Sequence, residues 1–260
     1  MFYFSDVKKI LIILFIVSVN SCSKYQKLLK SDNFDIKYET ALNYFNDSKY
    51  SRALTLFEDI LSEFKGSSKS EDIYYYYSYS LYKLGDYASA AYHFNNFSKT
   101  FFSSSKSEEM AFMSAKCYYL ETPPSYYDQK NTNNAINKLE FFISKYPNSN
   151  RVSEADSLIF QLNLLLEEKQ FNIAHSYYKT GKYNSAIYSF NNFIENYPNS
   201  KFLEEVFYCQ TKSYFELAKN SIDEKKDLRT KEFIFAYRDF TLTYPQSKYL
   251  GELKNLRDEL

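Results

Sequence analysis

The chain has 260 residues, and its 32 lysines and arginines are balanced by 32 aspartates and glutamates, so the formal net charge is zero. This balance gives no global field that would attract nucleic acid or an acidic membrane surface, and we expect no nucleic-acid partner. The chain has only four glycines and five prolines, which are too few turn-forming residues for a many-turned β-protein. It is rich in aromatic residues, with 28 tyrosines and 24 phenylalanines.

The N-terminal segment has the parts of a secretory signal peptide. A lysine pair precedes an apolar run over residues 10–19, and two small or polar residues separate this run from Cys22. The run is too short for a transmembrane helix, which takes about 20 residues. A cysteine in this place resembles the signal of bacterial lipoproteins, which are cleaved before the cysteine and acylated on it. The resemblance implies a signal peptide over residues 1–21 and lipidation, for example with palmitate, of Cys22; an uncleaved anchor or a plain secretion signal is the alternative.

One pattern occurs five times in residues 34–260, after a short tether over residues 22–33. Each copy closes on an aromatic residue, with an apolar residue four positions before it and an alanine eleven positions before it. The closing aromatics are Phe64, Phe101, Tyr146, Tyr197 and Tyr244, and the alanine position holds Ala53, Ala90, Ala135, Ala186 and, in the last copy, Phe233. A polar break with a serine follows each closing aromatic, and an acidic residue follows the break. This agreement indicates a repeat protein.

Each copy is predicted to form two helices. In the second copy, apolar residues recur three to four positions apart on either side of Gly85, which is the period of one helix face. Gly85, and Gly181 in the fourth copy, are placed to adopt the left-handed conformation that ends a helix. We therefore expect an all-α fold. The predicted helix pairs cover about residues 34–66, 71–103, 108–149, 153–200 and 204–247, and a terminal helix starts within 250–260.

The third, fourth and fifth copies are longer than the first two, and the additional residues of each can be located in the sequence. The third copy carries residues 121–134 between its helices, and the fourth has an extended first element over residues 153–180. The fifth carries residues 220–231, whose charged run over residues 223–227 is expected to be a solvated loop. Beyond Cys22, the two remaining cysteines are Cys117 and Cys209, which lie inside apolar helical patterns. We expect both to be buried packing residues without a disulfide.

The sequence offers little for catalysis. The two histidines, His93 and His175, have no nucleophile or ligand partner at a useful spacing. Glycine-rich phosphate loops and the HExxH and GxSxG motifs do not occur in the sequence. We therefore predict no enzymatic activity, no cofactor and no metal site.

The order of a turn glycine, an alanine early in the second helix, an aromatic residue and a closing proline resembles the tetratricopeptide repeat. That resemblance implies a right-handed superhelical solenoid of five helix pairs that acts as an interaction scaffold. The lipoprotein signal, the Tyr197-Pro198-Asn199-Ser200 type of ending and the Tyr127-Asp128-Gln129 insert together resemble the BamD family, in the style of Bacteroidetes-like lineages. Members of that family are lipoproteins of the outer-membrane β-barrel assembly (BAM) complex.

The resemblance implies a lipid-anchored protein at the periplasmic face of the outer membrane. Its C-terminal repeats would bind a BamA-like barrel-forming subunit, alongside other lipoproteins of the complex, and its N-terminal repeats would receive unfolded outer-membrane proteins. We expect a groove for an extended substrate peptide, and the tyrosines predicted to line it are Tyr38, Tyr75, Tyr79 and Tyr82. The alternative is that these are packing aromatics. Other functions remain open: a tetratricopeptide lipoprotein adaptor for cell-wall, secretion or motility machinery, or a surface lipoprotein that captures nutrients.

Overall fold

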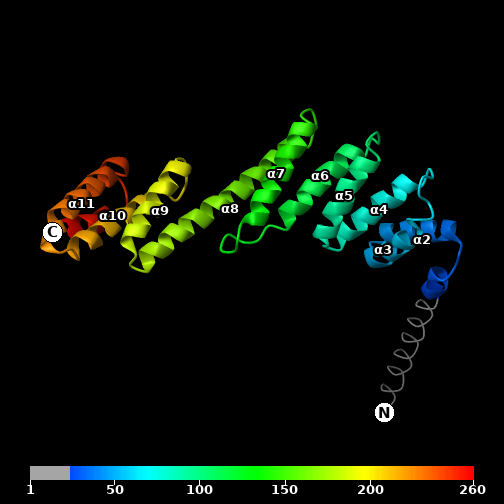
Figure 1. Cartoon of the computed structure of the whole chain (residues 1–260), viewed down its shortest axis with the longest axis horizontal. Coiled ribbons are helices and arrows are strands. Elements are labelled where there is room, and N and C mark those ends of the chain that lie inside the picture. Colours follow the sequence, from blue (N-terminus) through cyan, green and yellow to red (C-terminus); the bar gives the residue numbers. More distant parts are fainter. Residues whose placement is uncertain (1–23) are drawn as a thin grey trace, which may run out of the picture. The chain divides into compact units, whose positions relative to one another are not determined.

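The computed structural model describes residues 24–260, and within this range the chain is helical and has no strand (Figure 1). The helices are α2 (Phe34–Asn46), α3 (Tyr50–Ile60), α4 (Ser70–Lys83), α5 (Tyr87–Thr100), α6 (Ser107–Leu120), α7 (Lys130–Lys145), α8 (Val152–Lys179), α9 (Tyr183–Asn196), α10 (Leu203–Lys219), α11 (Asp223–Thr243) and α12 (Leu250–Asp258). Residues 24–29 are also helical. The predicted all-α class is confirmed. The predicted signal peptide and Cys22 lie outside the described residues.

The described residues form two compact units, one of residues 24–121 with 134–156 and one of residues 122–133 with 157–260. In the first unit, the helices from α2 to α6 each pack against the next one along the chain. In the second unit, α10 packs against both α9 and α11, and α12 closes on α10 and α11. Packing between sequence neighbours is the arrangement of a tetratricopeptide-type array. Within residues 24–260, no helix is both long and apolar enough to cross a membrane.

The repeated alanines lie in the buried core of the repeats. Ala53, Ala90, Ala135 and Ala186 are all fully buried, and so is Phe233, which replaces the alanine in the last repeat. The aromatic side chain four positions after the alanine is fully buried as well in three repeats, at Phe57, Phe94 and Phe190. A small side chain beside a large one lets the two surfaces interlock without a void. The recurring alanine position is therefore a core position of each repeat.

The two predicted turn glycines have left-handed backbones, with φ of 82° at Gly85 and 72° at Gly181. A side chain with a Cβ rarely adopts this conformation, so glycine lets the chain reverse within a few residues. Directly after the first of these turns, the Asp86 carboxylate accepts a hydrogen bond of 3.1 Å from the backbone N–H of Ser89 and so caps α5.

The structure corrects two expectations about the inserts. The charged run at residues 223–227 is not a loop, because α11 starts at Asp223. Two acids in its first turn, Asp223 and Glu224, are favourable at the positive end of the helix dipole. In the third repeat, only residues 121–129 connect the helices, and α7 starts at Lys130, earlier than expected.

Other expectations hold. The extended first element of the fourth repeat is α8, with 28 residues. Cys117 and Cys209 are both free thiols and both buried. A terminal helix, α12, covers the end of the last repeat and buries Leu253 completely.

Candidate binding site

From the second break onward, an acidic residue after the break links the first helices of successive repeats. We call the acid five positions after the break serine the junction acid; from the second break onward, the junction acids are Glu109, Glu154, Glu205 and Glu252. The Lys116 ammonium group donates to Glu154 over 2.7 Å, and Lys212 donates to Glu252 over the same distance. Each of these two junction acids thus holds a side chain from the first helix of the preceding repeat.

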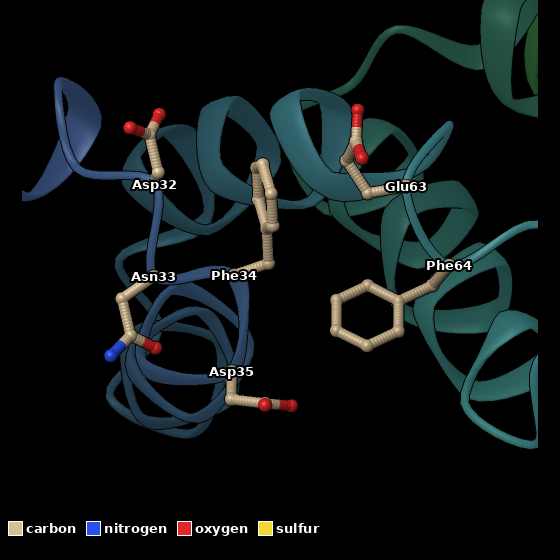
Figure 2. Close-up of a pocket in the computed structure, with 6 residues that line it drawn as sticks. All are labelled: Asp32, Asn33, Phe34, Asp35, Glu63 and Phe64. Carbon is tan, nitrogen blue, oxygen red and sulfur yellow. The ribbon is translucent and has the colours of Figure 1, made fainter.

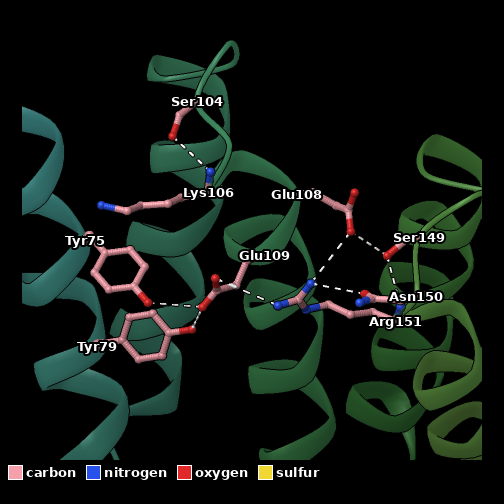
Figure 3. A network of polar contacts seen from close by, with 9 residues as sticks. All are labelled: Tyr75, Tyr79, Ser104, Lys106, Glu108, Glu109, Ser149, Asn150 and Arg151. Carbon is pink, nitrogen blue, oxygen red and sulfur yellow. Dashed lines mark hydrogen bonds and ion pairs between the residues drawn. The ribbon is translucent and has the colours of Figure 1, made fainter.

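The junction around Glu109 contains two of the tyrosines predicted to bind substrate (Figure 3). The hydroxyl groups of Tyr75 and Tyr79 on α4 both donate hydrogen bonds to one oxygen of the Glu109 carboxylate on α6. The Arg151 guanidinium lies 3.8 Å from Glu109 on its other side and 3.8 Å from Glu108. Glu109 therefore connects two rings of one repeat to a cation that precedes α8.

The tyrosine hydroxyls at this junction remain protonated at neutral pH. Burial, followed by the negative charge of Glu109, raises the pKa of Tyr75 to about 12. Burial and the hydrogen bond to Glu109 raise the pKa of Tyr79 as well. The Lys106 ammonium lies 4.8 Å from the centre of the Tyr75 ring, a favourable cation–π distance. The site thus combines aromatic surface, an anion and two cations.

The predicted groove tyrosines do not share one environment. Tyr75, Tyr79 and Tyr82 form a row of half-buried rings on α4, and both Tyr79 and Tyr82 pack edge-on against Phe94 of α5. Tyr38, in contrast, is only 8 % exposed, with its ring 6.3 Å from that of Phe64. A role for these residues in binding a peptide stays a prediction.

An open pocket of about 510 Å³ near the start of the first repeat was not predicted (Figure 2). Its lining residues are Asp32, Asn33, Phe34, Asp35, Glu63 and Phe64. Lys69 pairs with Asp35 over 2.8 Å and lies above the rings of both Phe64 and Tyr38. The pocket thus offers two aromatic rings inside an acidic rim, and Tyr38 adjoins it through Phe64. The only sequence feature that could have indicated this pocket is the group of acidic and aromatic residues at positions 32–35.

The histidines differ from each other. His93 packs edge-on against Tyr77, and its Nδ1 lies 3.2 Å from the Tyr74 hydroxyl, so it serves in packing. The sequence shows no ligand partner at a useful spacing for either histidine, but in the structure His175 lies beside two side chains that could share a metal ion with it. Its ring nitrogen, a Glu205 oxygen and the Cys209 sulfur all lie within 4.8 Å of one another. The cluster could not be found from sequence spacing, because His175 is on α8 whereas Glu205 and Cys209 are on α10.

Two comparisons with known proteins indicate the family of this chain. The family model of YfiO, described as an outer membrane lipoprotein, matches residues 32–187 and 164–260. The chain is also similar to the outer membrane protein assembly factor BamD of Caulobacter vibrioides (strain ATCC 19089 / CIP 103742 / CB 15), with 22 % identity over 186 residues. That match covers 72 % of this chain and spans 61 % of the length of the relative. Both matches support the resemblance to BamD, and the chain belongs to the YfiO family of outer membrane lipoproteins.

Proposed function

We propose that this protein is a scaffold lipoprotein of the outer-membrane β-barrel assembly complex, anchored at the periplasmic face of the outer membrane. The observation that carries the proposal is the family match, which extends from residue 32 to residue 260. An array of helix pairs supports it, because stacked repeats expose long surfaces for protein partners. The scaffold role requires no catalytic group, and we propose none.

The anchor in this proposal is lipid on Cys22. Its support is the sequence, with a lysine pair, a short apolar run and a small residue before the cysteine. Tyr25 lies close behind this position, and its hydroxyl donates to the backbone oxygen of Arg52 over 3.2 Å. The Tyr25 ring also packs 5.8 Å from Tyr44. These contacts would hold the start of the first repeat close to the membrane. Replacing Cys22→Ser should release the protein from membranes, whereas unchanged membrane attachment would contradict lipidation.

The second unit is the proposed binding surface for the barrel-forming subunit. Phe235 and Leu228 on α11 are 75 % and 63 % exposed, and they line a pocket of about 650 Å³ together with Phe207 and Tyr214 of α10. Large exposed apolar side chains around a hollow are typical of protein interaction sites.

A tagged full-length protein purified from membranes tests this assignment. Recovery of the barrel-forming subunit supports it, and recovery of cell-wall enzymes alone supports the adaptor alternative. The double replacement Phe235→Ala with Leu228→Ala should reduce recovery of the barrel subunit. Phe141→Ala is the matched control, because Phe141 is 67 % exposed on α7 in the first unit. Equal loss in both variants would contradict a surface on α11.

The first unit is the proposed receptor for unfolded outer-membrane proteins. The half-buried rings of Tyr75, Tyr79 and Tyr82, and the two phenylalanine rings of the pocket beside Phe64, offer flat apolar surfaces. Such surfaces suit an extended peptide that ends in an aromatic residue. Tyr75→Ala with Tyr79→Ala should weaken binding of a peptide from the C-terminus of a barrel protein without loss of helicity. The double variant Tyr75→Phe with Tyr79→Phe keeps both rings and removes both hydroxyls, so it shows which of the two groups the peptide needs. Tyr92→Ala is the control, because Tyr92 is a 62 % exposed tyrosine on α5. Unchanged affinity in the alanine pair would rule out this site.

A further inference from the structure

The junction between the fourth and fifth repeats differs in chemistry from the other junctions. Tyr79, Lys116 and Lys212 occupy equivalent positions on their first helices, and each donates to the junction acid of the next repeat. His175 occupies this position on α8, with its Nε2 atom 3.9 Å from the carboxylate of Glu205. Where the other junctions place a hydroxyl or an ammonium group, this one places an imidazole.

A thiol completes the cluster. Cys209 lies one helical turn after Glu205 on α10, so both side chains face α8. The position one turn after the junction acid is apolar in the other three junctions, where it holds Met113, Leu158 and Leu256. Among these four junctions, only the one on α10 brings imidazole, carboxylate and thiol together.

We propose that His175, Glu205 and Cys209 bind a zinc ion that joins the fourth repeat to the fifth. Imidazole nitrogen, carboxylate oxygen and thiolate sulfur are the donors zinc prefers, and three protein ligands leave a fourth position for water. Harder cations such as Mg²⁺ and Ca²⁺ prefer all-oxygen sites. The proposal concerns these residues alone and does not depend on the function proposed above.

The three ligand atoms need to move only slightly closer to one another to bind a zinc ion. Zinc bonds of about 2.0–2.3 Å place tetrahedral ligand atoms about 3.3–3.8 Å apart, and the His175–Glu205 pair at 3.9 Å is already close to this. The Phe171 and Tyr178 rings stack on the His175 ring at 5.3 and 6.0 Å and hold its orientation. Cys209 is 2 % exposed, whereas the side chains of His175 and Glu205 are 20 % and 42 % exposed. An ion can therefore enter from the rim and reach the thiol at the base.

Binding of a zinc ion to this cluster has to tolerate the nearby positive charges and to displace the proton of the thiol. Lys179, one helical turn after His175 on α8, adds a positive charge that a bound cation has to tolerate. When the Zn–S bond forms, it replaces the S–H bond of Cys209, and the thiol proton passes to solvent. Lys212 also lies close by, but its ion pair with Glu252 offsets its charge.

Cobalt titration of the chelator-treated full chain in detergent tests the site. We expect one Co²⁺ per chain with a near-ultraviolet sulfur-to-cobalt absorption that Zn²⁺ removes. His175→Tyr, which introduces the residue found at Tyr79, and Cys209→Ala should each weaken binding by at least about tenfold, since even outer-shell changes cost that much. Zn²⁺ should also raise the melting temperature of the unaltered protein but not that of either variant.

Two controls keep the experiment specific. Lys116→Ala removes the equivalent junction side chain in another repeat, and Cys117→Ser removes the other buried thiol; both should bind cobalt like the unaltered protein. Glu205→Gln, at the exposed rim, tests the cluster if Cys209→Ala fails to fold, and it should also weaken binding. Absence of the sulfur-to-cobalt band in the unaltered protein would overturn the proposal. So would its persistence in Cys209→Ala or its loss in Cys117→Ser.

Discussion

The hydroxyl of Ser104 donates a hydrogen bond of 2.7 Å to the carboxylate of Glu71, and this contact ties the end of the second repeat to its beginning. The same serine oxygen accepts the backbone N–H of Lys106 over 3.0 Å, just before α6 starts. Ser149 repeats the arrangement with Glu108 over 2.6 Å. At these breaks one serine therefore directs the chain into the next helix and also fixes the position of the preceding first helix. The backbone contact alone recurs at all five breaks, where the serine oxygen accepts the N–H two residues later.

Ser104→Ala should lower the free energy of unfolding by about 1–2 kcal/mol, because it removes a turn contact and a hydrogen bond to a carboxylate. Ser105→Ala, at the exposed neighbouring position, should change it by less than about 0.5 kcal/mol. Chemical denaturation followed by circular dichroism measures both. Similar values for the two variants would mean that the Ser104–Glu71 contact adds little.

The Tyr75–Tyr79–Glu109 junction should make stability depend on alkaline pH. The folded pKa of Tyr75, about 12, lies above the ordinary value of 10.0, and that of Tyr79 is raised as well. The folded state thus retains protons that the unfolded state loses, so this stability is fully present below pH 10 and is lost as the pH rises toward 12 and beyond. Tyr75→Phe with Tyr79→Phe should flatten this loss in urea titrations across that range. Parallel pH profiles for the variant and the unaltered protein would contradict the assignment.

The complete burial of Ala90 on α5 should make this position intolerant of larger side chains. Ala90 is fully buried, so Ala90→Leu forces the helices apart and should cost about 1–3 kcal/mol or more. Ala88 is exposed on the same helix, and Ala88→Leu should be nearly neutral. Thermal melts of the two variants give the comparison. A destabilised Ala88→Leu would point to helix propensity or solubility instead of packing.

The turn at Gly85 should be sensitive to any side chain, although there is space for one. A Cβ at Gly85 would meet nothing within 4 Å, so the cost of Gly85→Ala comes from its φ of 82° and should be about 1 kcal/mol. Gly251, inside α12, also has open space but an ordinary helical backbone, and Gly251→Ala should stabilise by up to about 1 kcal/mol. Opposite signs in the two unfolding free energies would confirm the backbone argument; equal signs would contradict it.

The helix pairs were predictable because their signals are local. The alanine and aromatic positions and the turn glycines recur at fixed spacings, and the buried alanines and left-handed glycines follow that pattern. The charged run at residues 223–227 was misread because it has no apolar period, and charge alone does not distinguish a solvated loop from an exposed first turn of a helix.

The junction contacts were not predictable from spacing. Tyr79 and Glu109 are 30 residues apart, Lys116 and Glu154 are 38 apart, and inserts of different length cause the difference. The sequence predicted an acidic residue after each break but not its partner, and from the second break onward the structure pairs such an acid with a side chain from the preceding repeat. The cluster of His175, Glu205 and Cys209 depends on the same stacking of first helices, so it appears only in three dimensions.

The last repeat should depend on α12 for its stability. Leu253 is fully buried where α12 packs on α10 and α11, and the Tyr249 ring stacks on Tyr208 at 3.9 Å. Leu253→Ala should cost about 2–4 kcal/mol and should speed amide hydrogen exchange in α10 and α11 before it affects the first unit. Leu260→Ala is the matched control, because Leu260 is 38 % exposed beyond the end of the same helix, and it should leave exchange unchanged. If Leu253→Ala left exchange in α10 and α11 unchanged, α12 would not be the element that stabilises the end of the array.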